Sequence, residues 1–212
     1  MPMIFDRFLT IIFTVFLVTL ASGRAEELAA GTARTEVVVS VAEQKLALMR
    51  NGEIVRIYPV STSRFGVGDA YGTYRTPLGR LRVSDKIGDG LAAGTVIHHR
   101  TPTSEILPPN APGRDPIVSR ILWLDGLEAR NRNAYGRCVY IHGTPDEKRL
   151  GRPASYGCIR MRSADVIDLY AAIPVGTEVS IIKERLPAGG RSWFAMLASA
   201  AVPASYAAPI RL

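Results

Sequence analysis

An Asn-Gly pair between two strand-like segments constrains the start of the fold more than any other feature. Asn51-Gly52 separates the segment 45–49, with leucines on one face, from the segment 53–60, whose side chains alternate. Asn-Gly between two such runs is the strongest short-range signal of a two-residue β-hairpin. A β-branched run, 36–41, precedes them. The sequence therefore predicts that the domain opens with a β-meander.

The rest of the chain favours short strands over helices. Further strand-like segments, bounded mostly by polar, Gly or Pro residues, are 78–83, 95–98, 121–124, 138–141 and 177–182. One segment has a helical period, with apolar residues at i, i+3, i+4 and i+7: Val166, Leu169, Tyr170 and Ile173. This predicts a helix from a cap at Ser163 to Ile173, ended by Pro174. We predict a mainly β domain with one or two short helices, an α+β fold, over residues 35–183.

Two long segments have no strand or helix period. Residues 61–77 are polar, contain three glycines and end in Thr76-Pro77, which predicts a loop. Residues 101–115 contain four prolines. A segment of this length without a period is uncommon inside a compact domain and is often a functional lid. We therefore expect the second segment to be a loop beside a functional site.

The first residues indicate export. An uncharged run from Phe8 to Leu20 follows Arg7 and ends on small residues around Gly23 and Ala25. This is the pattern of a secretory signal peptide, and the run is shorter than the about 20 residues that span a membrane. We predict a signal peptide at residues 1–25 and export to the periplasm or cell wall. An uncleaved N-terminal membrane anchor is the alternative.

Two further segments flank the predicted domain. Residues 26–34 are rich in Ala, Gly and Thr and are predicted to be a linker, and residues 184–212 form an Ala- and Pro-rich tail. The apolar residues of the tail fit either packing on the domain or peripheral contact with a membrane: Trp193, Phe194, Met196 and Leu197. The net charge of +7 favours polyanionic partners. Because the basic residues form no run of five or six, we expect no nucleic-acid partner.

A histidine and a cysteine sixteen positions apart are the candidate reactive groups, His142 and Cys158. A thiol attacks an acyl group only as the thiolate or with a base within reach. Gly143 and Gly157 permit close backbone approach, and the N–H groups of Gly157 and Cys158 are candidates for stabilising an oxyanion. Arg160 lies on the same face as Cys158 if this segment is extended, where it can hold a carboxylate.

Each of these residues also has a structural interpretation. The histidine can be part of the packing, and Arg160 can be surface charge. In an exported protein, Cys158 can form a disulfide with Cys138. His98 and His99 have no motif around them, and we interpret both as structural or exposed. No other Cys or His stands at ligand spacing, so we predict no metal site and no cofactor.

The combined motif is specific. H-G-T at 142–144 and S-Y-G-C-I-R-M at 155–161 resemble the L,D-transpeptidase catalytic domain, the YkuD family, whose members carry H-G-T followed by [ST]-x-G-C-[hydrophobic]-[RN]. The resemblance covers roughly residues 35–183. Many members have His where this chain has Tyr156 and Asn where it has Arg160. The role of that second His is therefore not carried over to this chain.

The resemblance implies a mechanism. Cys158 would attack the L,D bond before the terminal D-Ala of a peptidoglycan stem tetrapeptide, and His142 would take the thiol proton. An amine acceptor on peptidoglycan or protein would then resolve the acyl-enzyme, giving a 3–3 crosslink in the first case. In the family a backbone carbonyl orients the His, so no acidic third residue is required. We expect a monomer with these substrate-binding or oxyanion residues: Arg160, Gly157, Ser155, Tyr156 and Gly143.

Three alternatives remain open at this point. The same site can use water, which would make the protein an L,D-carboxypeptidase or a hydrolase that releases wall-bound protein. A sortase also uses His, Cys and Arg, but it usually spaces them more widely. From another class, the chain can be an inactive wall-binding domain held by a Cys138–Cys158 disulfide.

Overall fold

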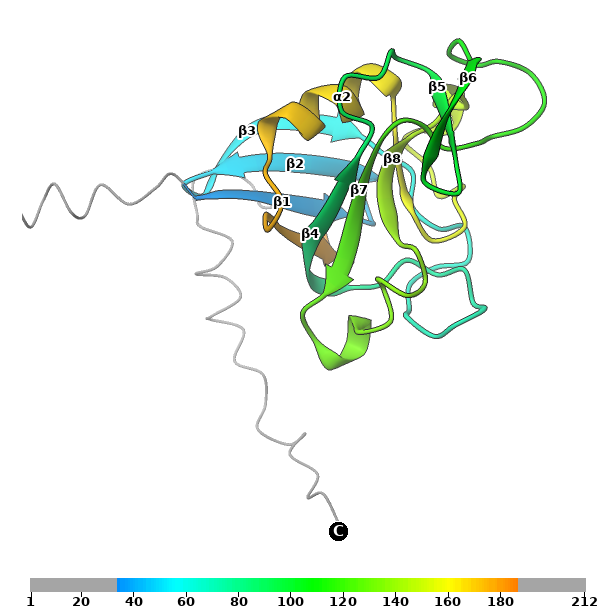
Figure 1. Ribbon diagram of the computed structural model, residues 1–212. Coiled ribbons are helices and arrows are strands. Elements are labelled where there is room, and N and C mark those ends of the chain that lie inside the picture. The colour runs from blue at the N-terminus through cyan, green and yellow to red at the C-terminus, as the bar shows by residue number, and fades with distance from the viewer. Residues whose placement is uncertain (1–33, 187–212) are drawn as a thin grey trace, which may run out of the picture. The chain divides into compact units, whose positions relative to one another are not determined.

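The computed structural model describes residues 34–186. The predicted signal peptide, most of the linker and the tail beyond residue 186 lie outside the described residues. Within them, the strands and helices are β1 Thr35–Ser40, β2 Lys45–Arg50, β3 Glu53–Pro59, β4 Gly79–Ile87, β5 Thr95–His98, β6 Thr101–Ile106, β7 Val118–Gly126, η1 Ala129–Asn131, β8 Tyr140–Gly143, η2 Glu147–Arg149, β9 Ile159–Met161, α2 Ser163–Ala172 and β10 Glu178–Ile182 (Figure 1). No helix of this part of the chain is long and apolar enough to cross a membrane.

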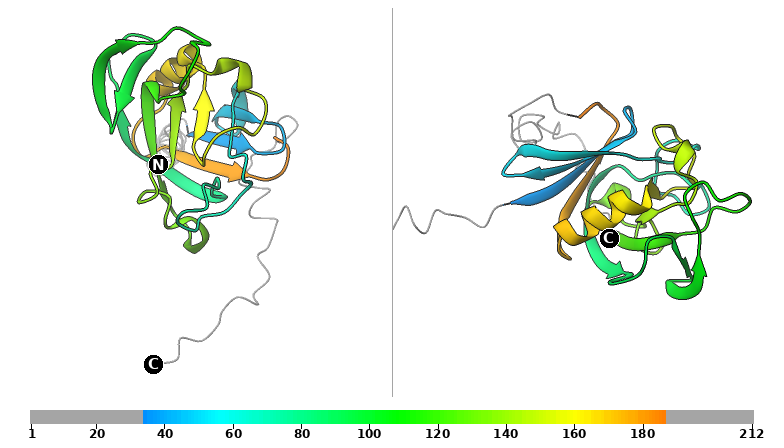
Figure 2. Two further views of the ribbon diagram at one scale, coloured as in Figure 1. Left: turned by 90° about the vertical axis from the view of Figure 1, so that its right-hand side faces the viewer. Right: turned by 90° about the horizontal axis from the view of Figure 1, so that it is seen from above.

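The ten strands belong to one hydrogen-bonded sheet. Its order is β3-β2-β1-β10-β4-β7-β5-β6, with β8 paired to β7 and β9 paired to β8. The β1–β10 and β8–β9 pairs are parallel, and the other pairs are antiparallel. The β5–β6 hairpin stands at the opposite end of the sheet from β1–β3 (Figure 2). The prediction of a mainly β domain is confirmed.

The opening meander forms as predicted. Asn51 and Gly52 both have positive φ, 51° and 83°, which is the backbone of a type I′ turn. The side chains of β2 are buried on both faces, since Leu46 and Leu48 join the main core while Ala47 and Met49 join a smaller apolar cluster. Strand β2 is thus covered on both faces, and it lies between β3 and β1 in the sheet.

Helix α2 packs its predicted apolar stripe into the main core. Val166, Leu169, Tyr170 and Ile173 are all buried there with residues of β1, β2, β4 and β7–β10. The prediction that Ser163 caps the helix is wrong. Arg162 is the N-cap residue and makes no side-chain cap, and Ser163 is the first helical residue. The Ser163 hydroxyl instead accepts a hydrogen bond from Ser119 Oγ at 2.9 Å. Both residues are buried, and a buried hydroxyl needs a hydrogen-bond partner.

Two charged side chains from other elements cap the ends of α2. Glu147 Oε1 accepts a hydrogen bond from the Ser163 backbone N–H at 3.1 Å. At the other end, Lys86 Nζ donates to the carbonyl oxygens of Tyr170, at 2.6 Å, and Ile173, at 2.9 Å. A carboxylate at the N-terminus and an ammonium at the C-terminus both complement the helix dipole. The helix is therefore held by residues distant in sequence.

The expectation of a loop over residues 101–115 is wrong for its first half. Strand β6 occupies Thr101–Ile106 and pairs with β5. The two-residue connection is His99-Arg100, with φ of 48° and 68°, so it has the type I′ backbone without a glycine or asparagine to signal it. Pro102 is tolerated because β6 is an edge strand of the sheet. The second half, from residue 107, is irregular as expected.

Candidate active site

The parallel pairing of β8 and β9 places the candidate residues on one face. His142 is paired with Arg160 and Ile141 with Ile159. Side chains alternate between faces along a strand, so the two isoleucines point together into the main core. The other face carries His142, Cys158 and Arg160, whose chemistry the sequence singled out, together with Tyr140. Cys158 and Tyr140 there join a third apolar cluster with Ile97 and Ile121.

The same register sets the separation of base and nucleophile. Cys158 lies just before β9, opposite Tyr140, and His142 is two residues further along β8. A strand spacing of about 4.8 Å and a rise of about 3.3 Å per residue put the two Cα atoms about 8 Å apart. Side chains that lean toward each other can close such a gap. The structure thus places His142 in β8 and Cys158 directly before β9, on the same face of this strand pair.

A backbone carbonyl orients His142. Its Nδ1 lies 2.8 Å from the Gly143 oxygen. A carbonyl only accepts, so Nδ1 carries the proton and Nε2 is left with its lone pair. Burial lowers the pKa of His142 to about 4, although this hydrogen bond and the Asp115 charge act in the opposite direction. At neutral pH the imidazole is therefore a neutral base with one accepting nitrogen.

The cysteine is also neutral at pH 7. Burial raises the pKa of the Cys158 thiol to about 11, against the effects of the Tyr140 backbone and of Arg137 and Arg160. Its Sγ donates a hydrogen bond to the Cys138 carbonyl oxygen at 3.4 Å. Cys158 is half-buried, so part of this residue contacts solvent. A thiol of this kind needs a base to become a nucleophile.

The turn before Cys158 is held by its own serine. The Ser155 hydroxyl donates to the Cys158 carbonyl at 2.6 Å and accepts from the Gly157 N–H at 3.2 Å. One of the two N–H groups proposed for the oxyanion is thus engaged by Ser155. Gly157 has a φ of +119°, and a Cβ there would lie 3.3 Å from the Arg75 carbonyl oxygen. The turn accordingly requires glycine at this position.

The 61–77 loop supports this turn from outside. Thr76 Oγ1 donates to the Gly157 carbonyl at 3.0 Å and accepts from the Ser63 N–H at 3.0 Å. The Thr76 side chain is fully buried. The sequence marked Thr76-Pro77 only as the end of a loop, and no local pattern indicates that this hydroxyl reaches the turn before Cys158.

Gly143 is required by the packing of β7 against β8. A Cβ at this position would lie 2.4 Å from the Val118 carbonyl oxygen, which is closer than real atoms approach. Any larger residue would move the strand that carries His142 and the carbonyl that orients it. The predicted close approach at Gly143 is confirmed.

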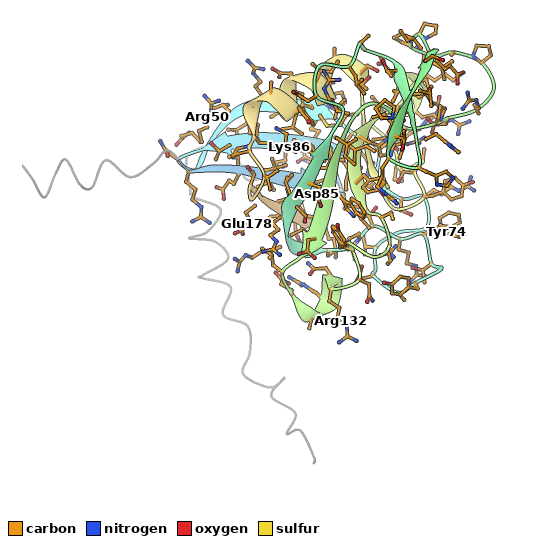
Figure 3. The ribbon with its side chains drawn as sticks, viewed as in Figure 1. Arg50, Tyr74, Asp85, Lys86, Arg132 and Glu178 are labelled. Atoms are coloured by element: carbon orange, nitrogen blue, oxygen red, sulfur yellow. The ribbon has the colours of Figure 1, made fainter. Side chains whose placement is uncertain are left out.

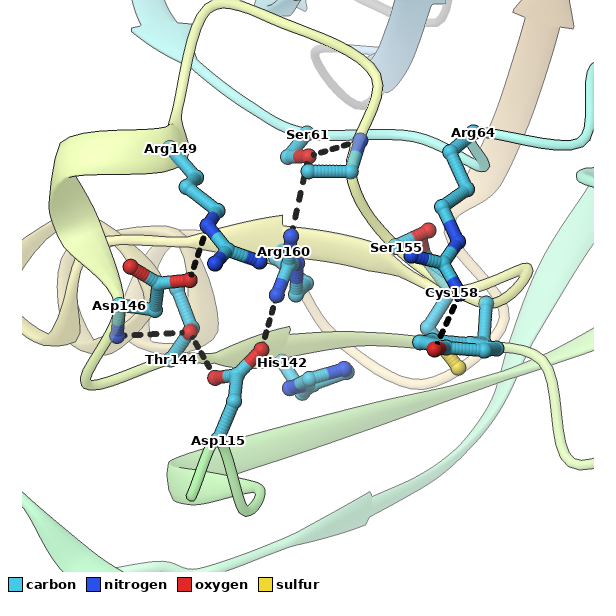
Figure 4. A network of polar contacts seen from close by, with 12 residues as sticks. Ser61, Arg64, Asp115, His142, Thr144, Asp146, Arg149, Ser155, Cys158 and Arg160 are labelled. Carbon is cyan, nitrogen blue, oxygen red and sulfur yellow. Dashed lines mark hydrogen bonds and ion pairs between the residues drawn. The ribbon is translucent and has the colours of Figure 1, made fainter. Parts of the chain in front are cut away.

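Arg160 is buried, which contradicts its interpretation as surface charge. It forms an ion pair with Asp115, and its side chain is 6% exposed against 30% for Asp115. The guanidinium also donates to Ser61 Oγ at 3.4 Å, while its Nε–H has no hydrogen-bond partner. Figure 4 shows this ion pair beside His142. Arg160 therefore lies in the site with its Nε–H unpaired.

Asp115 is a site residue that the sequence analysis missed. It accepts hydrogen bonds from Thr144 Oγ1 and from Arg160. It comes from the proline-rich segment, whose Asn110 N–H also donates to the Pro145 carbonyl at 2.5 Å. The second half of that segment thus lies against the site, as a lid would. No motif surrounds Asp115 in the sequence, so only the three-dimensional structure identifies it.

The two cysteines are free thiols. Cys158 Sγ contacts the Cys138 backbone, so the two residues are neighbours, but no disulfide joins them. His98 and His99 are exposed, in agreement with their interpretation. Within residues 34–186, no three His, Cys, Asp or Glu side chains lie close enough together to hold a metal ion.

Comparison with known proteins agrees with the motif. The family model of the L,D-transpeptidase catalytic domain, YkuD, matches residues 34–181. This chain belongs to the L,D-transpeptidase catalytic-domain family, and the resemblance predicted from the sequence is confirmed.

Individual proteins that are similar to this chain are named as members of the same family. The chain is 30% identical over 145 residues to YqjB of Bacillus subtilis, covering 68% of this chain and 69% of that protein. It is 32% identical over 153 residues to YcfS of Escherichia coli, covering 70% and 44% respectively. Both carry the name L,D-transpeptidase. A solved L,D-transpeptidase structure from Mycobacterium smegmatis aligns over 71% of this chain and 59% of that one, with 19% identity and a TM-score of 0.48.

Removing the charge of Asp115 should destabilise the fold. Asp115→Asn would leave Arg160 buried without its counter-ion, which costs about 3–5 kcal/mol for fully buried pairs. Because Asp115 is partly exposed, we expect a loss of about 2 kcal/mol in the free energy of unfolding, measured by urea denaturation.

The control is Glu105→Gln, which removes the exposed Arg114–Glu105 pair of the same segment. It should change stability by less than about 0.5 kcal/mol. Equal effects would mean that the Arg160 pair is as solvated as the surface pair.

The neutral state of both reactive groups predicts an unusual pH dependence of thiol labelling. Alkylation proceeds through the thiolate. With a pKa near 11, the rate at Cys158 should rise about tenfold per pH unit from pH 6 to pH 9 without levelling off. Rates of iodoacetamide labelling, resolved from Cys138 by peptide mass mapping, test this. A rate that is constant between pH 5 and 7 would instead indicate a thiolate–imidazolium pair.

Proposed function

We propose that this protein is an L,D-transpeptidase that acts on peptidoglycan stem peptides through a thioester at Cys158. The observation that supports this most is the His142 geometry. The imidazole is neutral, and its Nδ1–H donates to the Gly143 carbonyl, which leaves Nε2 as the accepting nitrogen. His142 lies on β8, which pairs with the segment that carries Cys158. This arrangement supplies the base that a neutral thiol needs, without a carboxylate partner.

The reaction follows from these roles. Cys158 Sγ attacks the carbonyl carbon of the L,D bond while Nε2 of His142 accepts the thiol proton. The C–N bond to the terminal D-Ala then breaks, and His142 returns the proton to the leaving amine. In the second half, an acceptor amine attacks the thioester, the S–C bond breaks, and the proton returns through His142 to the sulfur. Each group ends the cycle in its starting state.

Arg160 is proposed to contact the donor peptide. Its Nε–H is buried and has no hydrogen-bond partner, and a buried donor without a partner is costly unless a ligand completes it. A carbonyl or carboxylate oxygen of the stem peptide would be such a partner. Asp115 and the Ser61 hydroxyl, which both accept hydrogen bonds from the guanidinium, would then hold it in place during the reaction.

The acceptor is proposed to be an amine on a second stem peptide, which gives a 3–3 crosslink, or on a protein. Water is the alternative acceptor and would make the enzyme an L,D-carboxypeptidase or a hydrolase. Both thiols are free, which favours an active enzyme over a wall-binding domain with a disulfide. Export through the predicted signal peptide, action in the periplasm or cell wall and a monomeric state belong to the same proposal.

Product analysis tests the proposal. The protein is incubated with purified disaccharide-tetrapeptide, and the products are separated and weighed by mass spectrometry. We expect crosslinked dimers, and we expect Cys158→Ala to reduce turnover at least about a thousandfold while the protein stays folded, because the nucleophile is lost. Tripeptides without dimers would identify water as the acceptor. Full activity of Cys158→Ala would refute the assignment of the nucleophile.

A further inference from the structure

Three aromatic rings and an arginine form an exposed surface beside the catalytic turn. Phe65 and Tyr74 come from the 61–77 loop, and Tyr156 precedes Gly157 and Cys158. Their exposed fractions are 42%, 56% and 58%. Figure 3 shows Tyr74 projecting from the loop, far from Arg50 and Glu178. We name these three residues, together with Arg64, the aromatic platform.

The platform is organised by its own contacts. The Tyr156 ring centroid lies 5.5 Å from that of Phe65 and 5.8 Å from that of Tyr74. The Arg64 guanidinium lies 4.8 Å from the Phe65 centroid and 4.4 Å from the Tyr156 centroid, and it donates a hydrogen bond to the Tyr156 hydroxyl. Rings held in this way lose little conformational entropy when a ligand binds.

The fold does not explain why these rings face water. None of the three belongs to an apolar core cluster of the described residues. A contiguous group of exposed large apolar side chains is uncommon on a monomer and typically marks a binding site. Their packing with one another stabilises the platform but leaves much of each ring accessible. Contact with a ligand would bury that remaining surface.

The platform is continuous with the nucleophile. Tyr156 is two residues before Cys158, and the intervening Gly157 packs closely on the 61–77 loop, where a Cβ would lie 3.5 Å from the Tyr74 carbonyl oxygen. Thr76 links the same loop to the Gly157 carbonyl at 3.0 Å. A molecule bound across the platform would therefore extend directly into the catalytic turn.

The chemistry of the platform specifies the kind of ligand. Aromatic faces favour flat groups with C–H bonds, and the Arg64 guanidinium and tyrosine hydroxyls donate hydrogen bonds to hydroxyl and amide oxygens. The platform contains no carboxylate, and its arginine repels an ammonium group. A positively charged diamino acid is thus disfavoured. An uncharged N-acetylated amino sugar has the required C–H face, hydroxyls and amide carbonyl.

We propose that the aromatic platform binds amino-sugar rings of the glycan strand to which the stem peptide is attached. This inference rests on the proposed function, because it places the glycan and the peptide of one substrate on neighbouring parts of one site. It adds a specificity subsite: the enzyme would recognise the sugar as well as the peptide bond that it cleaves. Donors that carry the disaccharide would accordingly be preferred over free stem peptides.

A binding experiment tests the platform independently of catalysis. The probe is chitotetraose, an N-acetylglucosamine oligomer without peptide, titrated into the full-length protein and followed by NMR chemical shifts or calorimetry. We expect saturable binding that weakens about tenfold in Phe65→Ala, because one stacking face is lost. Phe65→Leu serves as a second variant if the alanine variant proves unfolded by circular dichroism. Tyr71→Ala, at an exposed tyrosine of the same loop outside the platform, should bind like the wild type.

A kinetic experiment tests the consequence for specificity. We expect the wild-type kcat/KM to be at least about tenfold higher for disaccharide-tetrapeptide than for free tetrapeptide. Phe65→Ala should remove this preference by raising KM for the disaccharide donor, with turnover of the free tetrapeptide unchanged.

Absence of chitotetraose binding, or binding of the stem peptide alone to the platform, would overturn the inference even if the protein is a transpeptidase. Sugar binding without any turnover would instead leave the subsite supported and refute the proposed reaction.

Discussion

The three residue pairs between the parallel strands β8 and β9 are the constraint on which the site depends. They fix Ile141 opposite Ile159 and His142 opposite Arg160. Since side chains alternate along a strand, this register points apolar residues into the main core and every reactive residue to the other face. A shift by one residue would turn His142 toward the main core and Ile141 toward the face that carries the site. The packing energy of the core therefore also holds the candidate site residues of these two strands on one face.

Burial and pairing divide the site into two electrostatic parts. His142 and Cys158 are both neutral at pH 7, because burial shifts the pKa of each toward its uncharged form. Arg160 and Asp115 are a charged pair that remains within hydrogen-bonding distance. Neutral reactive groups avoid the desolvation cost of a thiolate–imidazolium pair in the free protein. Both charges act on the pKa of His142, and the Arg160 charge also acts on that of Cys158.

Local patterns in the sequence predicted those features that local chemistry decides. Asn51-Gly52 specified a hairpin because its residues favour positive φ, and the apolar stripe of α2 predicted the buried face of the helix. The spacing of His142 and Cys158, with their glycines, predicted a shared site. The β5–β6 hairpin was missed because His99 and Arg100 adopt positive φ without the residues that signal it.

Features that depend on distant residues were not accessible from the sequence. Helix α2 is capped by Glu147 and Lys86, neither of which belongs to it. Asp115 reaches Arg160 across 45 positions, and the Thr76 hydroxyl reaches Gly157 across 81. These contacts follow from how the sheet brings segments together, so no motif of one segment could indicate them. The motif residues of the site could be named from the sequence, but the distant residues that contact them could be found only from the structure.

The central claim is that Cys158 carries the acyl group, and intact-protein mass spectrometry tests it most directly. The protein is mixed briefly with disaccharide-tetrapeptide, quenched in acid and weighed, and the modified residue is located by peptide mapping. The account predicts an added mass equal to the donor less one alanine, located at Cys158, lost on treatment with hydroxylamine and absent from His142→Ala at the same time point. Turnover without any adduct at Cys158, or an adduct at Cys138, would contradict it.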